Sequence, residues 1–144
     1  MMRYLTHLGG TTATLLPGLV LLFIPTLRDV GAAVLIANAS SNLIVQVLKR
    51  WVARPRPCDA NGRPLALVPL PDPFSFPSGH ATAATAVAVT LSLAVPSLAA
   101  LLLPLAVLVA ASRVTLRVHH IGDVLAGAAL GMLAALLAAR LFML

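Results

Sequence analysis

The chain has 144 residues, of which 60% are hydrophobic and only 10% are charged, and its mean hydropathy is +0.99. Because a soluble domain has about 25% charged residues, this composition argues against a soluble globular protein, and it excludes a disordered chain. At about 20 apolar residues per membrane crossing, the length allows five or six helices. We therefore predict a single membrane-embedded domain over residues 1–144.

The formal net charge is +6, from ten basic and four acidic side chains. The basic residues stand beside apolar runs and do not alternate with aromatic residues. We therefore expect the bilayer and phosphate-bearing lipids as partners, and no nucleic acid. Cys58 is the only cysteine, which excludes an intramolecular disulfide.

Apolar runs separated by helix-breaking residues predict five transmembrane helices, in chain order over residues 11–27, 30–51, 79–95, 98–117 and 120–144. Arg28 and Asp29 should form a tight polar turn between the first two helices. In the last helix, Gly127 and Gly131 form a G-x-x-x-G pattern that is typical of close helix packing. The predicted fold class is an all-α polytopic membrane helical bundle.

A proline-rich loop separates the second and third predicted helices. Residues 52–77 contain seven of the eleven prolines in the chain, and proline prevents a continuous helix. Because the chain crosses the membrane at each helix, this loop shares one membrane face with the start of the first helix and with the turn between the last two. Most of the polar side chains should gather there, and long loops of this kind often carry function.

The first chemically distinctive segment joins Lys49, at the end of the second predicted helix, to Arg56-Pro57 in the loop. Fixed cations at a membrane surface attract phosphate, and an arginine can bind two phosphate oxygens at once. Taken alone, these residues also fit the cationic anchors that are common at the ends of membrane helices.

The second segment, Pro77-Ser78-Gly79-His80, opens the third predicted helix. Ser78 is a typical N-cap residue, and Gly79 would let the backbone approach a ligand closely. The unpaired N–H groups of a helix start favour an anion, and His80 would lie at the mouth of such a site. Simple capping explains the same residues when the segment is taken alone.

The third segment places Arg113 at the end of the fourth predicted helix and His119 at the start of the fifth. Asp123 follows His119 by four residues, so both should lie on one helical face. A carboxylate bonded to one imidazole nitrogen fixes the tautomer and makes the other nitrogen a better nucleophile. An aspartate in a membrane helix is costly, which favours a functional pairing.

The three segments together supply what phosphoryl transfer requires, namely fixed cations, a nucleophile and an acid. They match, with every spacing, the motifs K-x6-RP, P-S-G-H and S-R-x5-H-x3-D of the type 2 phosphatidic acid phosphatase superfamily. The chain therefore resembles this superfamily, which includes lipid phosphate phosphatases and vanadium haloperoxidases. The resemblance covers the second to the fifth predicted helix.

The resemblance implies hydrolysis of the phosphomonoester or diphosphate of a lipid, such as a phosphatidic acid-like glycerolipid or a polyprenyl diphosphate. It also implies which residues bind the phosphate: Lys49, Arg56, Ser78, Gly79 and Arg113.

The catalytic roles that the resemblance implies fall on three further residues. His119 would attack phosphorus and form a phosphohistidine, and Asp123 would orient it. His80 would protonate the leaving group and then activate water. The phosphatases of the family need no metal or other cofactor, and a cluster of fixed cations would repel a divalent ion.

Two other classes of function compete with this hypothesis. One is a lipid-phosphate binding or transport protein with an inert anion pocket, which would not need both histidines and the aspartate. The other is a vanadate-dependent haloperoxidase, whose known members are large and soluble. A zinc site formed by His80, His119 and Asp123 is a further alternative, and the surrounding cations argue against it.

Bacterial members of the superfamily commonly have six helices, one more than is predicted here. The missing peripheral helix would leave the site intact, and it would either widen lateral access for lipid or favour a homodimer. Arg54, Arg117 and His120 match no motif position, and we interpret them as rim residues, of which the two arginines could bind a second phosphate. The basic excess on the motif face would place it in the cytoplasm, whereas the resemblance implies an extracytoplasmic site on the inner membrane, which we adopt.

Overall fold

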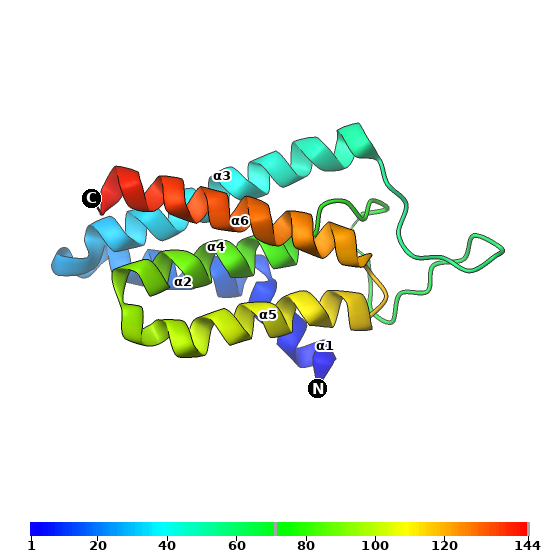
Figure 1. The fold of residues 1–144 in the computed structure, drawn as a ribbon, viewed down its shortest axis with the longest axis horizontal. Helices are drawn as coiled ribbons and strands as arrows, with labels where there is room; N and C mark the ends of the chain where they lie inside the picture. Colours follow the sequence, from blue (N-terminus) through cyan, green and yellow to red (C-terminus); the bar gives the residue numbers. More distant parts are fainter. Residues whose placement is uncertain (71, 144) are drawn as a thin grey trace.

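The computed structural model of the protein describes residues 1–70 and 72–143. Pro71 of the proline-rich loop and Leu144 of the last predicted helix therefore lie outside the described residues. The described parts of the chain are helical, apart from the loop, and contain only two isolated β-bridges. The helices run side by side as a bundle, and the loop extends from one end of it (Figure 1). The predicted all-α bundle is confirmed.

The main helices are α2 to α6, in the order α2 (Thr11–Leu22), α3 (Arg28–Val52), α4 (Gly79–Ala94), α5 (Ala99–Thr115) and α6 (Ile121–Phe142). They correspond to the five predicted helices, with shifted ends. Among the described residues, three stretches are long and apolar enough to cross a membrane: Pro25–Val52, Pro96–Thr115 and Ile121–Phe142.

The predicted turn at Arg28 and Asp29 is wrong, because both residues belong to the first turn of α3. The chain instead reverses between α2 and α3 through the short 3-10 helix η2 (Pro25–Leu27). Proline suits the start of a helical turn because its φ angle is already fixed. Asp29 is then favourably placed, since a carboxylate in the first turn interacts with the positive end of the helix dipole.

The first ten residues form structure that the sequence analysis did not predict. A single turn, α1 (Met2–Leu5), leads into the 3-10 helix η1 (Thr6–Gly9). Together they are bent by 47° from α2, and the bent pair is a candidate for a fourth membrane crossing. The segment η1 packs against α4 and α5 near the polar end of the bundle, so it contributes to the wall of the site described below.

Helix α4 is the centre of the bundle, packed against α3, α5 and α6 (Figure 1). Its 16 residues span about 24 Å, which is shorter than the hydrocarbon core of a bilayer. Its buried side chains are alanine and threonine. Because α4 is surrounded by other helices, it needs close packing more than an apolar, lipid-facing surface.

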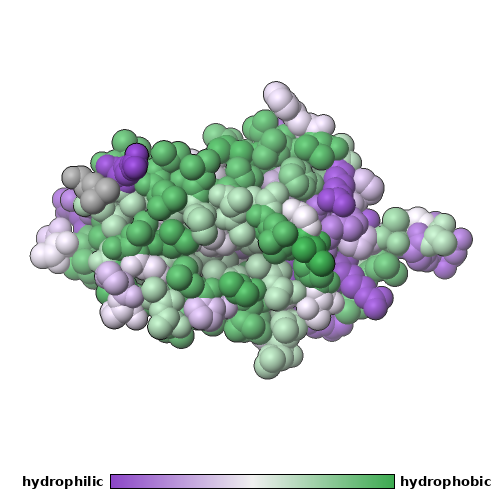
Figure 2. All heavy atoms as spheres, in the orientation of Figure 1, coloured by the Kyte–Doolittle hydropathy of each residue, from purple (hydrophilic) through white to green (hydrophobic). Residues whose placement is uncertain are grey.

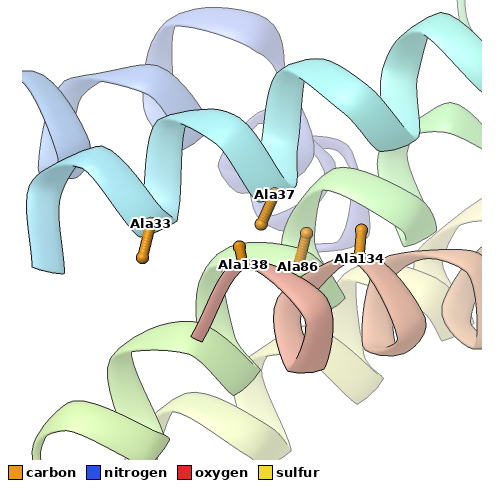
Figure 3. Close-up of a cluster of buried hydrophobic side chains, with 5 residues drawn as sticks. All are labelled: Ala33, Ala37, Ala86, Ala134 and Ala138. Carbon is orange, nitrogen blue, oxygen red and sulfur yellow. The ribbon is translucent and has the colours of Figure 1, made fainter. Parts of the chain in front are cut away.

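Small residues let the helices around α4 approach one another. Alanines from α3, α4 and α6 meet in one cluster (Figure 3), made up of Ala33, Ala37, Ala86, Ala134 and Ala138. On α6, a Cβ atom at Gly127 would lie 2.5 Å from the carbonyl oxygen of Ser78. A Cβ at Gly131 would collide with the carbonyl oxygen of Thr82 and lie 3.0 Å from the amide nitrogen of Ala86. The G-x-x-x-G pattern is thus the contact surface between α6 and α4.

Two helices end where a residue other than glycine adopts a left-handed conformation. Ala53 has a φ of 47° and terminates α3, and Arg117 has a φ of 56° and follows the end of α5 at Thr115. Such a conformation costs about 1–2 kcal/mol. It turns the chain sharply after each helix, toward the segments that carry Arg56 and His119.

The surface is divided as a membrane protein requires. Apolar residues cover most of the visible flank of the bundle, and polar residues gather mainly at the end where Figure 1 places the loop (Figure 2). The loop and the turn between α5 and α6 therefore lie on one face, as predicted. Together with its candidate spans, this pattern identifies the chain as a membrane protein.

The packing of α6 on α4 predicts different outcomes for two glycine-to-alanine substitutions in the same helix. Gly131→Ala should destabilise the protein by about 1–3 kcal/mol, as expected for overpacking against backbone. Gly122→Ala is the matched control, because its Cβ would meet only Arg54 Nη1 at 3.8 Å. Thermal unfolding in detergent, followed by circular dichroism, measures both. Equal melting temperatures for the two variants would contradict this packing.

Candidate active site

A cavity of about 250 Å³ opens at the polar end of the bundle. It brings together six of the eight predicted site residues, which come from α3, the loop, α4, α5 and the turn before α6: Lys49, Arg56, Gly79, His80, Arg113 and His119. Ser78 and Asp123 lie beneath this surface with fully buried side chains. Segments that are distant in the sequence therefore converge at one end of the bundle, as the alternating direction of the helices predicted.

Three cations of the site are removed from solvent. Lys49 and Arg56 are each 6% exposed, and Arg113 is 4% exposed. The guanidinium of Arg56 is held by backbone, since Nη1 donates to the carbonyl of Val118 and Nε donates to the carbonyl of Asp72, both at 2.9 Å. Buried charges of one sign repel each other and are stable only with partners, so this cluster favours an anion among them.

The sequence analysis missed the anion that the cluster already contacts. The carboxylate of Asp72, in the loop, accepts hydrogen bonds from Lys49 Nζ at 2.6 Å and from Arg56 Nη2 at 3.2 Å. Burial alone would raise the pKa of Asp72, but the hydrogen bond from Lys49 and the charges of Lys49 and Arg56 together lower it below its usual value. Asp72 is thus ionised at neutral pH and contacts cations that a phosphate would need.

His119 is held in one tautomer by a backbone carbonyl. Its Nδ1 lies 2.6 Å from the carbonyl oxygen of Ser75, and a carbonyl can only accept, so Nδ1 carries the proton. Burial, together with the positive charges of Arg56 and Arg113, lowers the pKa of His119 to about 3. The imidazole is therefore neutral at pH 7, and Nε2 keeps a free electron pair.

The predicted geometry of His119 and Asp123 differs from the observed one. Helix α6 begins at Ile121, so His119 precedes the helix and does not share a helical face with Asp123. The nearest carboxylate oxygen is 3.8 Å from His119 Nδ1, while Ser75 provides the hydrogen bond. The spacing of four residues could not reveal this, because the chain between them turns at the N-cap, His120.

Asp123 instead organises the start of α6 and its neighbours. Its buried carboxylate accepts hydrogen bonds from the backbone amide of His120 at 2.7 Å and from Arg54 Nη1 at 2.9 Å. His120 completes a capping box with it. The backbone carbonyl of Asp123 accepts from the amide of Ser78 at 2.9 Å, which ties α6 to the start of α4.

The start of α4 has the form that the sequence predicted. Ser78 is the N-cap, and its hydroxyl oxygen accepts from the amide of Ala81 at 3.5 Å. Gly79 lines the cavity, where a Cβ would lie no closer than 3.7 Å to its neighbours. Packing alone therefore does not require glycine there, and the space it leaves is available to a ligand. Direct binding of phosphate by Ser78 stays a prediction.

The predicted rim residues have other contacts. Arg54 is committed to the ion pair with Asp123, although its side chain is 41% exposed. His120 caps α6, and Arg117 lies in the turn after α5. The binding of a second phosphate by Arg54 would therefore have to compete with this ion pair.

The N-terminal segment forms a wall that sequence reasoning did not find. The hydroxyl of Thr6 accepts a hydrogen bond from Arg113 Nη1. A Cβ at Gly9 would lie 3.0 Å from the carbonyl oxygen of His80 and 2.6 Å from Val109 Cγ1, so glycine lets η1 lie directly on the start of α4. Neither Thr6 nor Gly9 belongs to a recognisable motif, so only the packing of η1 in the structure shows that they border the site.

The ion pair of Asp72 yields a testable expectation. Asp72→Asn should bind inorganic phosphate about fivefold more tightly, because the anion no longer competes with a carboxylate worth about 1 kcal/mol. Asp59→Asn is the matched control, with the same change of charge in the exposed part of the same loop. Calorimetric titration of each variant at pH 7 measures the affinity. Weaker binding by Asp72→Asn would mean that Asp72 chiefly positions the cations.

Comparison with known proteins agrees with this geometry. The profile described as the PAP2 superfamily matches residues 30–143. The chain is 37% identical over 112 residues to an undecaprenyl-diphosphatase of Sulfolobus acidocaldarius, covering 77% of this chain and 54% of that protein. It is 41% identical over 101 residues to a decaprenylphosphoryl-5-phosphoribose phosphatase of Mycolicibacterium smegmatis, covering 68% and 50%. The chain thus spans about half the length of both relatives.

A solved structure also matches the fold. The crystal structure of a transmembrane PAP2 type phosphatidylglycerolphosphate phosphatase from Bacillus subtilis superposes with a TM-score of 0.79 at 34% identity, over 97% of this chain and 74% of that one. The sequence profile and the structural match agree with the three motifs. This chain belongs to the PAP2 superfamily.

Proposed function

We propose that this chain is a membrane phosphatase that hydrolyses the phosphomonoester or diphosphate of a lipid through a phosphohistidine on His119. The observation that carries the proposal is the state of His119. A neutral imidazole with Nδ1 bonded to Ser75 lines a cavity together with three buried cations. Such a site combines a nucleophile with fixed positive charge, as phosphoryl transfer requires.

In the first step, Nε2 of His119 attacks phosphorus as the bond from phosphorus to the leaving oxygen breaks. The proton that the leaving oxygen needs comes from His80, which lines the same cavity and which the negative charge of the bound phosphate would hold in its protonated form. Lys49, Arg56 and Arg113 would neutralise the charge on the three non-bridging oxygens, with the amide of Gly79 as a further donor. The products are a phosphohistidine and the lipid leaving group.

In the second step, a water molecule attacks the phosphohistidine while His80, now neutral, accepts its proton. The bond between phosphorus and Nε2 breaks, and inorganic phosphate leaves. His119 returns to its starting state, because the carbonyl of Ser75 retains the proton on Nδ1 throughout. Asp123, 3.8 Å from this nitrogen, would stabilise the positive charge that the imidazole carries during the attack.

Three fixed cations can perform the charge neutralisation that a divalent ion performs in other phosphatases. We therefore propose that no metal is required. The described residues would act as one phosphatase domain, whose apolar flank keeps the lipid tail in the bilayer while the headgroup enters the polar end. The two relatives and the solved structure are all named as phosphatases of lipid phosphates, which supports this substrate class.

The decisive test is phosphate release from a lipid phosphate in detergent with EDTA present. His119→Ala should lower kcat by at least about a thousandfold, because the nucleophile is lost. His120→Asn, which keeps an N-cap acceptor beside the same turn, should retain most of the activity. Quenching wild type in alkaline detergent with phosphate-labelled substrate should yield labelled His119, because the bond between phosphorus and nitrogen survives base but not acid. Tight binding of the lipid without phosphate release would instead support a lipid-phosphate binding protein.

We further propose that the polar end faces the extracytoplasmic side of the inner membrane. Cys58 lies exposed in the loop at this end, and it is the only cysteine in the chain. A membrane-impermeant maleimide should label it in intact spheroplasts, as strongly as in lysed membranes. Labelling only after lysis would place the site in the cytoplasm. A homodimer stays a prediction, which cross-linking in membranes can test.

A further inference from the structure

A second cavity, of about 410 Å³, lies directly beside the candidate active site. His80 and Arg113 line both cavities, so they form the partition between them. The far side of the second cavity is formed by the N-terminal segment and by the loop. Its lining residues from these segments are Arg3, Thr6, His7, Leu67, Val68 and Pro69.

The chemistry of this cavity favours an anion. Arg3 and His7 bring nitrogen donors from α1 and η1, and the wall contains no acidic residue within the described chain. Neither side chain forms an ion pair with any carboxylate of the described residues. Both therefore remain able to bind a ligand.

Arg113 gives an independent sign of an unfilled polar contact. Its Nη1 donates to the hydroxyl of Thr6, but its Nε is buried and has no hydrogen-bond partner among the described residues. A buried guanidinium N–H without an acceptor costs free energy. Because Arg113 lines both cavities, a ligand between them would meet a guanidinium whose donors are not all satisfied by the described residues.

The position of the cavity indicates which part of a substrate it would receive. If His80 protonates the leaving oxygen, the leaving group lies on the side of His80, and the second cavity extends the site on that side. Leu67, Val68 and Pro69 supply an apolar wall next to the cationic one. The cavity therefore suits a leaving group that carries both a negative charge and a hydrocarbon part.

We infer that the second cavity is a subsite for another phosphate, located in the leaving group and bound by Arg3, His7 and Arg113. The inference rests on the proposed function and narrows its substrate class to lipids that carry two phosphates. The second phosphate is either bonded directly to the first, as in a lipid diphosphate, or joined through a glycerol as a phosphodiester. Arg3 and His7 lie outside residues 30–143, which the family profile matches, so neither belongs to the three motifs.

The experiment compares substrates that share a tail and differ in one phosphate. Farnesyl diphosphate is paired with farnesyl monophosphate, and phosphatidylglycerophosphate with phosphatidic acid. For each pair, kcat/KM for the substrate with two phosphates is divided by kcat/KM for the substrate with one. This ratio is measured for wild type and for the double variant Arg3→Gln/His7→Gln. Loss of two donors to a phosphate should lower the ratio about tenfold or more in the pair whose second phosphate reaches the subsite.

Two further variants separate this inference from simpler explanations. Arg63→Gln removes a charge from the exposed part of the loop at the same end, and it should leave both ratios unchanged. Arg3→Lys keeps the charge and should preserve most of the ratio. A double variant that loses activity equally on both members of each pair would overturn the subsite and indicate a structural role for the N-terminal segment.

The outcome for the wild type distinguishes failure of the subsite from failure of the proposed function. Wild type that releases phosphate from none of the four lipids contradicts the phosphatase itself. Wild type that hydrolyses them with ratios unaffected by the double variant contradicts only the subsite. A reduced ratio in the farnesyl pair alone assigns the subsite to diphosphates, and a reduced ratio in the glycerolipid pair alone assigns it to phosphodiesters.

Discussion

Like charges buried at one end of a membrane bundle must find counter-charges, and this requirement shapes the whole site. Lys49, Arg56 and Arg113 are almost fully buried, at a cost that rises as solvent is removed. The carboxylate of Asp72 and the backbone carbonyls that accept from Arg56 offset part of this cost. The remaining positive charge favours an anion in the cavity. Burial, together with the charges of Arg56 and Arg113, lowers the pKa of His119.

The apolar packing in the middle of the bundle serves the same site. Gly127 and Gly131 let α6 lie so close to the start of α4 that a Cβ at either position would collide with backbone there. This approach brings the start of α6 beside the start of α4, where the amide of Ser78 donates to the carbonyl of Asp123. Two of the three motifs are thereby joined through backbone, which holds His119 and His80, the proposed nucleophile and proton donor, on one rigid frame.

The third motif shows where local reasoning reaches its limit. A spacing of four residues predicted that Asp123 would accept the proton of His119, but the N-cap of α6 falls between them. His119 therefore points to the carbonyl of Ser75, 44 residues earlier in the chain. The carboxylate of Asp123 instead accepts hydrogen bonds from Arg54 Nη1 and from the backbone amide of His120. His119 still has the predicted tautomer, with the proton on Nδ1, but the group that fixes it is a neutral carbonyl and not a carboxylate.

The sequence alone determined the membrane class, the helical bundle and the three motifs, because hydropathy and residue spacing are local properties that survive without tertiary contacts. It also placed the polar ends of the helices on one face, since each crossing reverses the chain direction. Only the tertiary structure decided that Asp72 contacts the cations, that Ser75 orients His119, and that η1 lies over His80 and Arg113. These are contacts between segments far apart in the chain, and their geometry depends on how helix ends and loops pack, which no periodicity or motif encodes.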